Sequence, residues 1–217
     1  MKKIIFIVSI GLFSLASEAQ GTLQGGNTLV FRKSPDFDDT AIAGSRYLSE
    51  NFKTAKVNKG TEDFLIRYNA YGDIMEYKNI DETLELIKEK NTFFNFADGT
   101  IYELLTYKID NKNFQRYHQI LSDNGLVKVS KFQSIKLNPA RQASNSYEKD
   151  SQASYSQNRD TYFITINGVT HPFDGKRRSL EKLFPNNVNA IKEFYKKNKI
   201  KENDTDMIVL GQFLNNL

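Results

Sequence analysis

Short runs of aromatic and β-branched residues, separated by turn-forming residues, fill the middle of this 217-residue chain. They constrain its fold more than any other feature of the sequence. Gly72, Gly99 and Gly125 follow one another at intervals of 27 and 26 residues. Asp-Gly and Asn-Gly, the pairs that end at Gly99 and Gly125, suit hairpin turns because both central positions of such a turn can take positive φ. This pattern predicts antiparallel sheet.

Two of these turns have similar surroundings. The segment from Tyr68 to Glu76 is echoed by the segment from Phe94 to Glu103, with one residue inserted before the glycine. A repeat protein needs three or more units to bury a continuous core, so two good copies favour hairpins that merely resemble each other. We expect consecutive hairpins in an antiparallel meander over residues 46–173, with strands near 52–57, 63–70, 73–78, 83–88, 92–97, 100–109, 114–121 and 126–137, and a last hairpin at 161–173 that turns at Asn167-Gly168.

Two segments lack this strand pattern. Residues 20–45 contain turn signals without sustained periodicity, which predicts an extended segment that leads into the domain. Residues 138–160 are polar, aperiodic and rich in Ser, Gln and Asn, which predicts a mobile loop between two strands. The alternative for this loop is a partner-binding segment that uses Tyr147 and Tyr155.

Residues 174–217 change to a helical period. Apolar residues recur in three stripes at helical spacing, and Pro185 brings the first stripe to an end. The stripes are Leu180, Leu183 and Phe184; Val188, Ile191, Phe194 and Tyr195; and Met207, Leu210, Leu214 and Leu217. Each helix has one apolar face that must be covered. We therefore expect an α+β domain, an antiparallel β-meander that is strongly curved or barrel-like, with the C-terminal helices packed on it.

The N-terminus has the three parts of a secretory signal peptide. Two lysines precede an apolar run at residues 4–15, and Ser17 and Ala19 place small side chains at the −3 and −1 positions of a cleavage site. We expect residues 1–19 to be removed, so that the mature protein begins at Gln20 and works in the periplasm, on the outer surface or as a secreted protein. The alternative is a membrane anchor, but a spanning helix needs about 20 apolar residues, and we expect no transmembrane span in the mature protein.

The chain contains no cysteine. A thiol nucleophile, a thiolate metal site and a disulfide are therefore excluded, and the fold must rest on its apolar core. A hydrophobic content of 39% is sufficient for such a core. The net charge of +4 is mild, whereas a nucleic-acid-binding domain carries a clear basic stripe, so we expect no nucleic-acid partner.

The sequence offers few ligands for a metal. His118 and His171 are the only histidines, and neither HExxH nor GxSxG occurs, so a zinc site or a catalytic triad lacks its further members. The acidic run at residues 36–39 could bind calcium. It lacks the spaced acidic positions of the EF-hand pattern, and we interpret it as a solvated turn. We expect no metal and no cofactor.

Three carboxylates follow the two similar turns. Asp73, Glu76 and Glu103 supply more than the pair that glycoside hydrolysis requires. Their equivalent placement in two hairpins instead favours a structural role at the start of a strand. An envelope hydrolase acting through these carboxylates or His118 is our alternative function.

The stretch from Asp174 to Lys201 is the best candidate for an interaction surface, with nine basic residues against three acidic ones. As the polar face of an amphipathic helix, its lysines could meet lipid head groups, a polyanionic glycan or an acidic protein. The lysines concerned are Lys192, Lys196, Lys197 and Lys199. The alternative is an ordinary solvated helix face.

The segment Tyr-Asn-Ala-Tyr-Gly-Asp-Ile-Met-Glu at residues 68–76 resembles uncharacterised exported proteins of Gram-negative bacteria. So does the ending, from Leu-Phe-Pro at 183–185 through the lysine-rich stretch to Phe-Leu-Asn-Asn at 213–216. The resemblance covers about a third of the chain, implies an envelope or secreted location, and brings no known activity. The function we expect is that of a non-catalytic secreted or envelope binding protein, with an anionic envelope component or a protein as partner.

Overall fold

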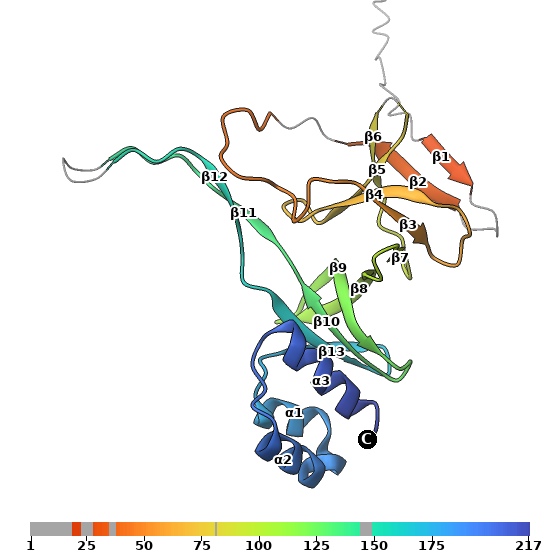
Figure 1. Cartoon of the computed structure of the whole chain (residues 1–217), viewed down its shortest axis with the longest axis vertical. Helices are drawn as coiled ribbons and strands as arrows, with labels where there is room; N and C mark the ends of the chain where they lie inside the picture. The colour runs from red at the N-terminus through yellow and green to blue at the C-terminus, as the bar shows by residue number, and fades with distance from the viewer. Residues whose placement is uncertain (1–18, 23–27, 35–37, 81, 144–148) are drawn as a thin grey trace, which may run out of the picture.

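The computed structural model describes residues 19–22, 28–34, 38–80, 82–143 and 149–217. In this part of the chain, a strongly curled antiparallel sheet of twelve strands is joined by a separate pair of strands and three short helices near the C-terminus (Figure 1). The predicted α+β fold class is confirmed. Residues 1–18, and with them nearly all of the predicted signal peptide, lie outside the described residues.

The main sheet has the strand order β1-β2-β6-β5-β4-β3-β7-β8-β9-β10-β13-β14, and its neighbouring strands are antiparallel. Its strands are β1 (Ala19–Thr22), β2 (Thr28–Lys33), β3 (Lys53–Val57), β4 (Phe64–Asn69), β5 (Ile74–Lys78), β6 (Thr83–Leu86), β7 (Phe93–Phe96), β8 (Ile101–Ile109), β9 (Lys112–Asp123), β10 (Val127–Phe132), β13 (Thr161–Ile166) and β14 (Val169–Phe173). A second, two-stranded sheet contains β11 (Ile135–Asn138) and β12 (Ser154–Gln157).

Turn residues lie at the ends of the hairpins, as the sequence predicts, but in the Asp98-Gly99 and Asn124-Gly125 pairs only the glycine has a positive φ. Asn167 and Gly168 have φ values of 50° and 79°, the two positive values expected of the turn between β13 and β14. Asp110 and Asn111, with φ values of 47° and 64°, form the two-residue turn between β8 and β9 without a glycine. Asn and Asp adopt this left-handed region more readily than other side chains, so the longest hairpin of the sheet needs no Asp-Gly or Asn-Gly pair.

The order of the strands differs from a simple meander at one point. Strands β3 to β6 follow one another in the sheet, but β7 pairs with β3 and not with β6. The far edge of β6 is taken by β2, where Phe31 lies opposite Leu86. The segment at 20–45, predicted only to be extended, thus supplies β1 and β2 to the sheet and leaves β3 as the edge available to β7.

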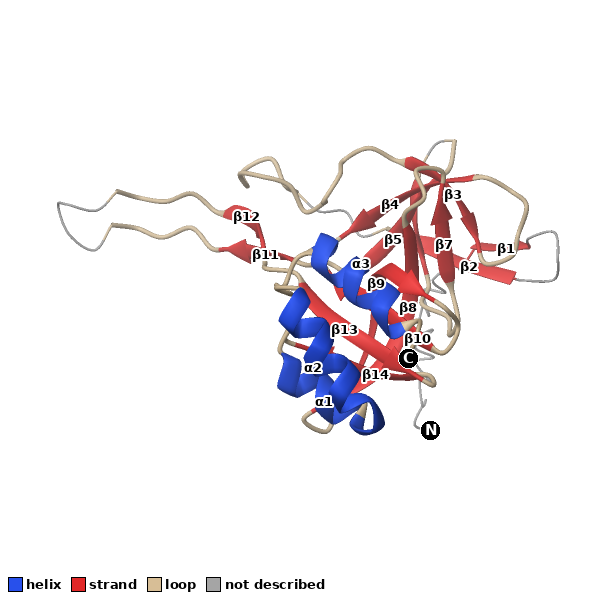
Figure 2. Cartoon of the chain, turned by 60° about the horizontal axis from the view of Figure 1, so that its bottom comes forward, coloured by secondary structure: helices blue, strands red, loops and turns tan. Residues whose placement is uncertain are grey.

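The predicted loop at 138–160 is partly a strand. Ser154–Gln157 pairs with Ile135–Asn138, and the backbones of Arg141 and Ser151 exchange two further hydrogen bonds. Figures 1 and 2 show these strands as an arm that projects from the body of the molecule. Backbone pairing needs no apolar side chains, which explains why the composition did not reveal the strand. Residues 144–148, including Tyr147, lie outside the described residues.

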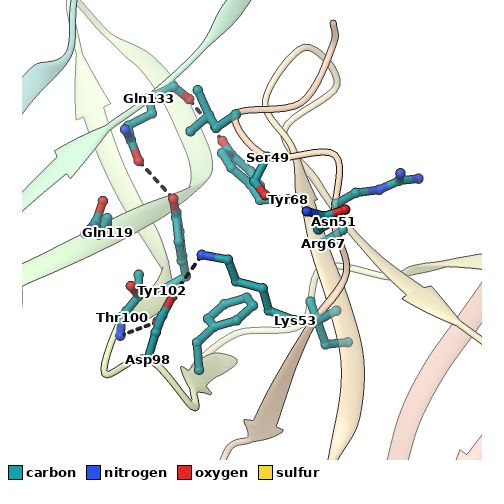
Figure 3. A pocket seen from close by; sticks show the side chains of 13 residues that line it. Ser49, Asn51, Lys53, Arg67, Tyr68, Asp98, Thr100, Tyr102, Gln119 and Gln133 are labelled. Atoms are coloured by element: carbon teal, nitrogen blue, oxygen red, sulfur yellow. Dashed lines mark hydrogen bonds and ion pairs between the residues drawn. The ribbon is translucent and has the colours of Figure 1, made fainter.

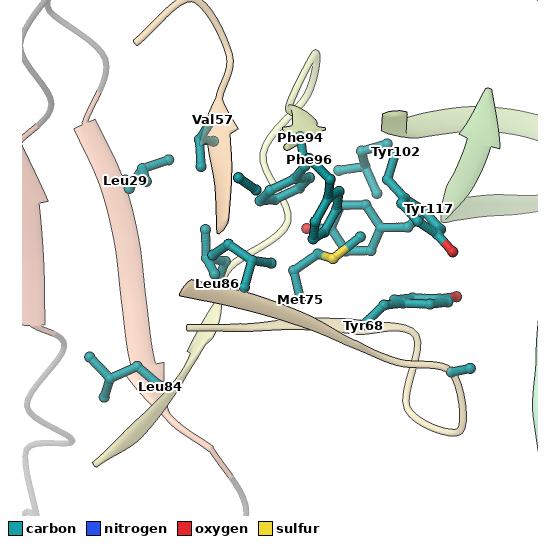
Figure 4. Close-up of a cluster of buried hydrophobic side chains, with 14 of the residues drawn as sticks. Leu29, Val57, Tyr68, Met75, Leu84, Leu86, Phe94, Phe96, Tyr102 and Tyr117 are labelled. Carbon is teal, nitrogen blue, oxygen red and sulfur yellow. The ribbon is translucent and has the colours of Figure 1, made fainter. Parts of the chain in front are cut away.

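Alternate residues of the strands from β2 to β9 point into the largest apolar cluster (Figure 4). Its centre includes Val57, Ile66, Met75, Phe94 and Tyr117, none of which has exposed surface. The rings of Phe94 and Tyr117 pack edge to face, with 5.6 Å between their centroids. Each fully buried apolar side chain of this size contributes about 1.5–3 kcal/mol, so this cluster holds the curled sheet together.

The three helices cover the same sheet further along, beside β10, β13 and β14 (Figure 2). They are α1 (Arg177–Leu183), α2 (Val188–Lys197) and α3 (Asp204–Leu214), with a short 3-10 turn at Pro185–Asn187 that ends α1 as predicted. Asn203 caps α3 by accepting a hydrogen bond from the Asp206 amide. In α3, Gly211 lies very close to Ser122 of the sheet, and an added Cβ would come within 2.4 Å of the Ser122 side chain. The absence of a side chain at Gly211 therefore allows α3 to pack this closely on β9.

The apolar stripe of α2 turns inward. Ile191 is fully buried, in one cluster with Val129 and Ile164 of the sheet. Phe194 stacks on Phe213 of α3, with ring centroids 4.2 Å apart, so α2 packs partly on α3 and not on the sheet alone. No helix in the described part of the chain is long and apolar enough to cross a membrane.

Candidate functional site

A pocket of about 250 Å³ lies where strands β3 and β4 face strands β8 and β9 (Figure 3). Strands, turns and loops from several parts of the chain meet there. The lining residues are Leu48, Ser49, Asn51, Lys53, Ile66, Arg67, Tyr68, Phe96, Asp98, Thr100, Tyr102, Gln119 and Gln133. The pocket therefore combines aromatic walls, neutral hydrogen-bonding groups and a few charges, the composition usual in ligand sites.

Tyr68 and Tyr102 form the aromatic wall, with ring centroids 5.1 Å apart. The Tyr102 hydroxyl donates to Oε1 of Gln133 at 2.8 Å. The Tyr68 hydroxyl lies 2.9 Å from Oδ1 of Asp73 and 3.1 Å from the carbonyl oxygen of Gln133. Both phenols are thus held in position by the protein, and Gln133, just beyond β10, fixes the wall from behind.

An ion pair lies along the rim of the pocket. The Lys53 ammonium donates to Asp98 at 2.8 Å, and the Thr100 amide donates to the other Asp98 oxygen at 2.9 Å. The hydrogen bond from Lys53 is the main reason why the pKa of Asp98 falls to about 2. Because the two side chains are 50% and 43% exposed, their pairing contributes little to stability and can rearrange around a ligand.

Three side chains of the wall and rim, Tyr68, Tyr102 and Asp98, have fixed protonation states at neutral pH. Burial raises the pKa of Tyr68 and Tyr102 above the usual value for tyrosine, so both remain protonated. Asp98, with a pKa of about 2, remains ionised. A general base works best with a pKa near the working pH, and these three side chains do not meet that requirement. They can bind and orient a ligand as donors or acceptors.

His118 lies outside this pocket, in a third apolar cluster on the other face of β8 and β9. Its ring centroid is 4.5 Å from that of Phe163 and 5.2 Å from that of Tyr107, and the residue has no exposed surface. Its Nδ1 is 3.3 Å from the Ser130 hydroxyl. Burial, followed by the nearby Arg116, lowers its pKa to about 3. His118 is therefore a neutral core residue that a substrate does not reach.

The three carboxylates of the two similar turns are each held by the protein. Lys88 and the Tyr117 amide donate to Asp73, whose pKa is raised mainly by burial. Arg67 pairs with the fully buried Glu76, and Lys128 pairs with Glu103. None of the three lines the pocket. Their contacts fit the structural role that the sequence favoured.

Glu76 also anchors the loop that precedes β3. Its oxygens accept from Arg67 at 2.6 Å, from the Tyr47 hydroxyl at 3.0 Å and from the Asn69 amide at 3.0 Å. The Arg67 guanidinium lies over the Tyr47 ring, 3.6 Å from its centroid. This network ties Tyr47 to β4 and β5. It thereby places the following loop residues, Ser49 and Asn51, at the pocket.

The predicted binding residues are in two different situations, apart from Tyr147, which lies outside the described residues. Lys192, Lys196, Lys197 and Lys199 are all exposed, on α2 and just after it. Tyr155 is buried, and its hydroxyl donates to Asp39 at 2.9 Å, so it serves the root of the arm. Of the acidic run at 36–39, Asp39 thus contacts protein groups and Asp38 bonds to Thr40. The described residues contain no cluster of three or more His, Asp or Glu that could hold a metal ion.

Sequence reasoning did not find the pocket, because its residues come from segments far apart in the chain. One signal pointed toward it. The two similar segments at 68–76 and 94–103 supply Tyr68, Phe96 and Tyr102, which form the aromatic walls. Because these similar hairpins lie in one curled sheet, their similar aromatic residues come together at the pocket.

Comparisons with known protein families, with curated proteins and with solved structures find no match to this chain. The resemblance to uncharacterised exported proteins stays a prediction. The function must therefore be inferred from the chain's own residues.

Proposed function

We propose that this chain is a non-catalytic binding protein that works outside the cytoplasm, in the envelope or as a secreted protein. Its ligand is a small uncharged molecule rich in hydroxyl or amide groups, such as one sugar unit, held in the pocket at Tyr68 and Tyr102. The observation that carries this proposal is the pocket itself, which joins aromatic walls to neutral donors and acceptors.

The lining supports an uncharged ligand. Ser49, Asn51, Thr100, Gln119 and Gln133 offer hydroxyl and amide groups, which bind neutral polar partners from either side of a hydrogen bond. The charged lining residues are paired, Lys53 with Asp98 at the rim and Arg67 with Glu76. A strongly charged ligand would have to break the rim pair, whereas a neutral ligand can hydrogen-bond to both of its members.

The size of the pocket supports a small ligand. A volume of about 250 Å³ is just below the range of about 300–1,000 Å³ that is common for ligand pockets. The exposed rim residues leave the pocket open to solvent, so the terminal unit of a longer chain also fits this description. Aromatic rings such as Tyr102 provide apolar contact to the less polar face of such a unit.

Binding is favoured over hydrolysis because the candidate catalytic groups are elsewhere. His118 is enclosed by aromatic rings, and Asp73, Glu76 and Glu103 have basic partners. The extracytoplasmic location is supported by the pattern of residues 1–19 alone. Without cysteine, the fold needs no oxidative step after export.

The proposal is tested by nuclear magnetic resonance on the labelled mature protein, titrated with a panel of neutral sugars, N-acetylated sugars and small amides. We expect one class of compound to shift the backbone amide signals of Ser49, Asn51, Thr100 and Gln119 together. Asn51→Ala and Gln119→Ala, which remove lining amides, should each weaken binding about fivefold, the effect of losing one neutral hydrogen bond. Gln212→Ala, which removes an exposed amide from α3, is the matched control and should bind normally.

Two results would contradict the proposal. If every compound in the panel leaves the pocket amides unshifted, or shifts signals elsewhere, the pocket is not the ligand site. If product signals grow during the titration, the protein is an enzyme, and the hydrolase alternative is restored.

A further inference from the structure

Positive charge is concentrated on the helical hairpin formed by α1 and α2. Within residues 174–201, each of the three acidic side chains has a basic partner a few residues away: Asp174 pairs with Lys176, Glu181 with Arg177 and Glu193 with Lys196. The remaining basic side chains have no carboxylate partner in the described part of the chain; they are Arg178, Lys182, Lys192, Lys197, Lys199 and Lys201. Six positive charges therefore remain uncompensated within this short stretch.

The acidic residues that follow neutralise this surface only in part, and Asp204 shares its basic partner with Asp160. Glu202 pairs with Arg159 at 3.3 Å, and Asp204 pairs with the buried Lys131 at 2.6 Å. Asp206 accepts hydrogen bonds from the Asn203 side chain and from the backbone amide of Lys201. Glu202 and Asp204 thus hold the start of α3 against the body of the protein, whereas Asp206 bonds to neutral groups beside Lys201 and offsets one positive charge there.

The lysines of α2 stand on a rigid support. The opposite side of the helix is fixed by the burial of Ile191, by the stacking of Phe194 on Phe213 and by a 3.0 Å hydrogen bond from the Tyr195 hydroxyl to the carbonyl oxygen of Gly175. Because its apolar side is used in the core, the helix cannot insert that side into a bilayer. Any interaction made by this surface is electrostatic and takes place at the surface of the partner.

We propose that the exposed basic side of the α1–α2 hairpin docks on the surface of an anionic lipid bilayer. Five of the six uncompensated groups are lysines, whose ammonium groups act as point charges without the two-pronged geometry that recognises a single phosphate. Such groups suit a diffuse layer of negative charge, and each adds to attraction by an anionic membrane within the screening distance.

The position of the hairpin fits docking on a plane. Figure 1 shows α1 and α2 at one end of the long axis of the molecule, with β1 to β6 at the other end. Contact through this end leaves the pocket at Lys53 and Tyr102 and the projecting arm free. Docking is independent of what the pocket binds, so this inference stands or falls separately from the proposed function.

Co-sedimentation with lipid vesicles tests the proposal. The mature protein is mixed with vesicles of phosphatidylcholine alone, or of phosphatidylcholine with phosphatidylglycerol, at low and at high NaCl concentration. We expect binding only to the vesicles that contain phosphatidylglycerol, and only at low salt. Replacing Lys192, Lys197 and Lys199 with glutamine should lower the partition coefficient roughly a hundredfold.

A matched triple variant controls for the change in net charge. Lys59→Gln, Lys108→Gln and Lys112→Gln remove three exposed lysines from turns and strand ends of the sheet, none of which has a carboxylate partner among the described residues. These changes should leave binding unchanged. Thermal unfolding of both variants verifies that they are folded. The proposal is overturned if the wild-type protein does not bind anionic vesicles. It is also overturned if the α2 variant binds as tightly as the wild type, or if the control variant loses binding to the same extent. Binding to a sulfated polysaccharide without binding to vesicles would assign the surface to glycans instead.

Discussion

Acidification should destabilise the folded chain through His118. This imidazole is enclosed by Phe163, Tyr107 and Phe132, and burial lowers its pKa from 6.5 to about 3. Between these two values the unfolded chain binds a proton at His118 and the folded chain does not. Stability rises with pH wherever the unfolded state binds more protons. Above about pH 7 the free energy of unfolding therefore carries no penalty from His118. The penalty grows, and this stability is lost, as the pH falls from about 6.5 toward 3.

The size of the effect follows from the unfolded-state value alone, provided that the folded pKa is well below 5. When the pH is lowered from 8 to 5, protonation of an imidazole with a pKa of 6.5 stabilises the unfolded state by about 2 kcal/mol. The buried imidazole, with a pKa of about 3, gains almost nothing over the same range. His118 should thus remove about 2 kcal/mol from the free energy of unfolding.

Urea unfolding at several pH values, followed by circular dichroism, measures this quantity. In His118→Gln, the loss of stability between pH 8 and pH 5 should be about 2 kcal/mol smaller than in the wild type. Each protein is compared with itself at pH 8, so the packing lost with the ring cancels. His171→Gln, which removes the other histidine from edge strand β14, is the matched control for loss of an imidazole. If wild type and His118→Gln lose the same stability on acidification, the reasoning about burial is refuted.

Four further predictions concern packing, the arm and export. Phe194→Ala should lower the free energy of unfolding by about 3 kcal/mol, because it removes a packed ring between α2 and α3; a silent variant would show that the helix is not packed there. Arg67→Met should destabilise by about 3–5 kcal/mol in the same assay, since it leaves Glu76 buried without its cation. Replacing residues 139–153 with a short Gly/Ser linker should preserve the melting temperature, and a collapsed fold would make the arm structural. N-terminal sequencing of exported protein should begin at Gln20, and mature material that retains Met1 would exclude cleavage.

The local structure of this chain could be predicted because turn chemistry and periodicity act over a few residues. Asn167-Gly168 and Pro185 mark the end of an element by their own backbone preferences, and the stripe around Ile191 indicates a helix without reference to the rest of the fold. The choice of neighbour for β7 could not be predicted in this way. It depends on whether β2 occupies the edge of β6, which is a competition between distant segments.

The pocket could not be predicted from the sequence for the same reason. Lys53 and Asp98 are 45 residues apart, and Tyr102 and Gln133 are 31 residues apart, so no window of sequence contains either pair. The role of Glu76 was easier to anticipate, because its partner Arg67 lies opposite it in the neighbouring strand of one hairpin. The burial of Tyr155 could not be anticipated, because the segment around it is polar and yet this aromatic side chain packs in the core.

Because the chain crosses from β6 to β7, some strand pairings of the sheet are local and can form quickly, whereas others join distant segments and form more slowly. The β8–β9 hairpin closes through a two-residue turn, and such hairpins form in about 1–10 μs. The pairing of β2 with β6 instead brings together Arg32 and Glu85, which are 53 residues apart, and the chain entropy of that closure must be overcome before the contacts stabilise it. We expect β2 to join the sheet late. The pocket joins Tyr68 of β4 to Tyr102 of β8 across another long-range pairing, that of β3 with β7. A ligand that contacts both tyrosines would therefore bind only the completed fold and draw the folding equilibrium toward it.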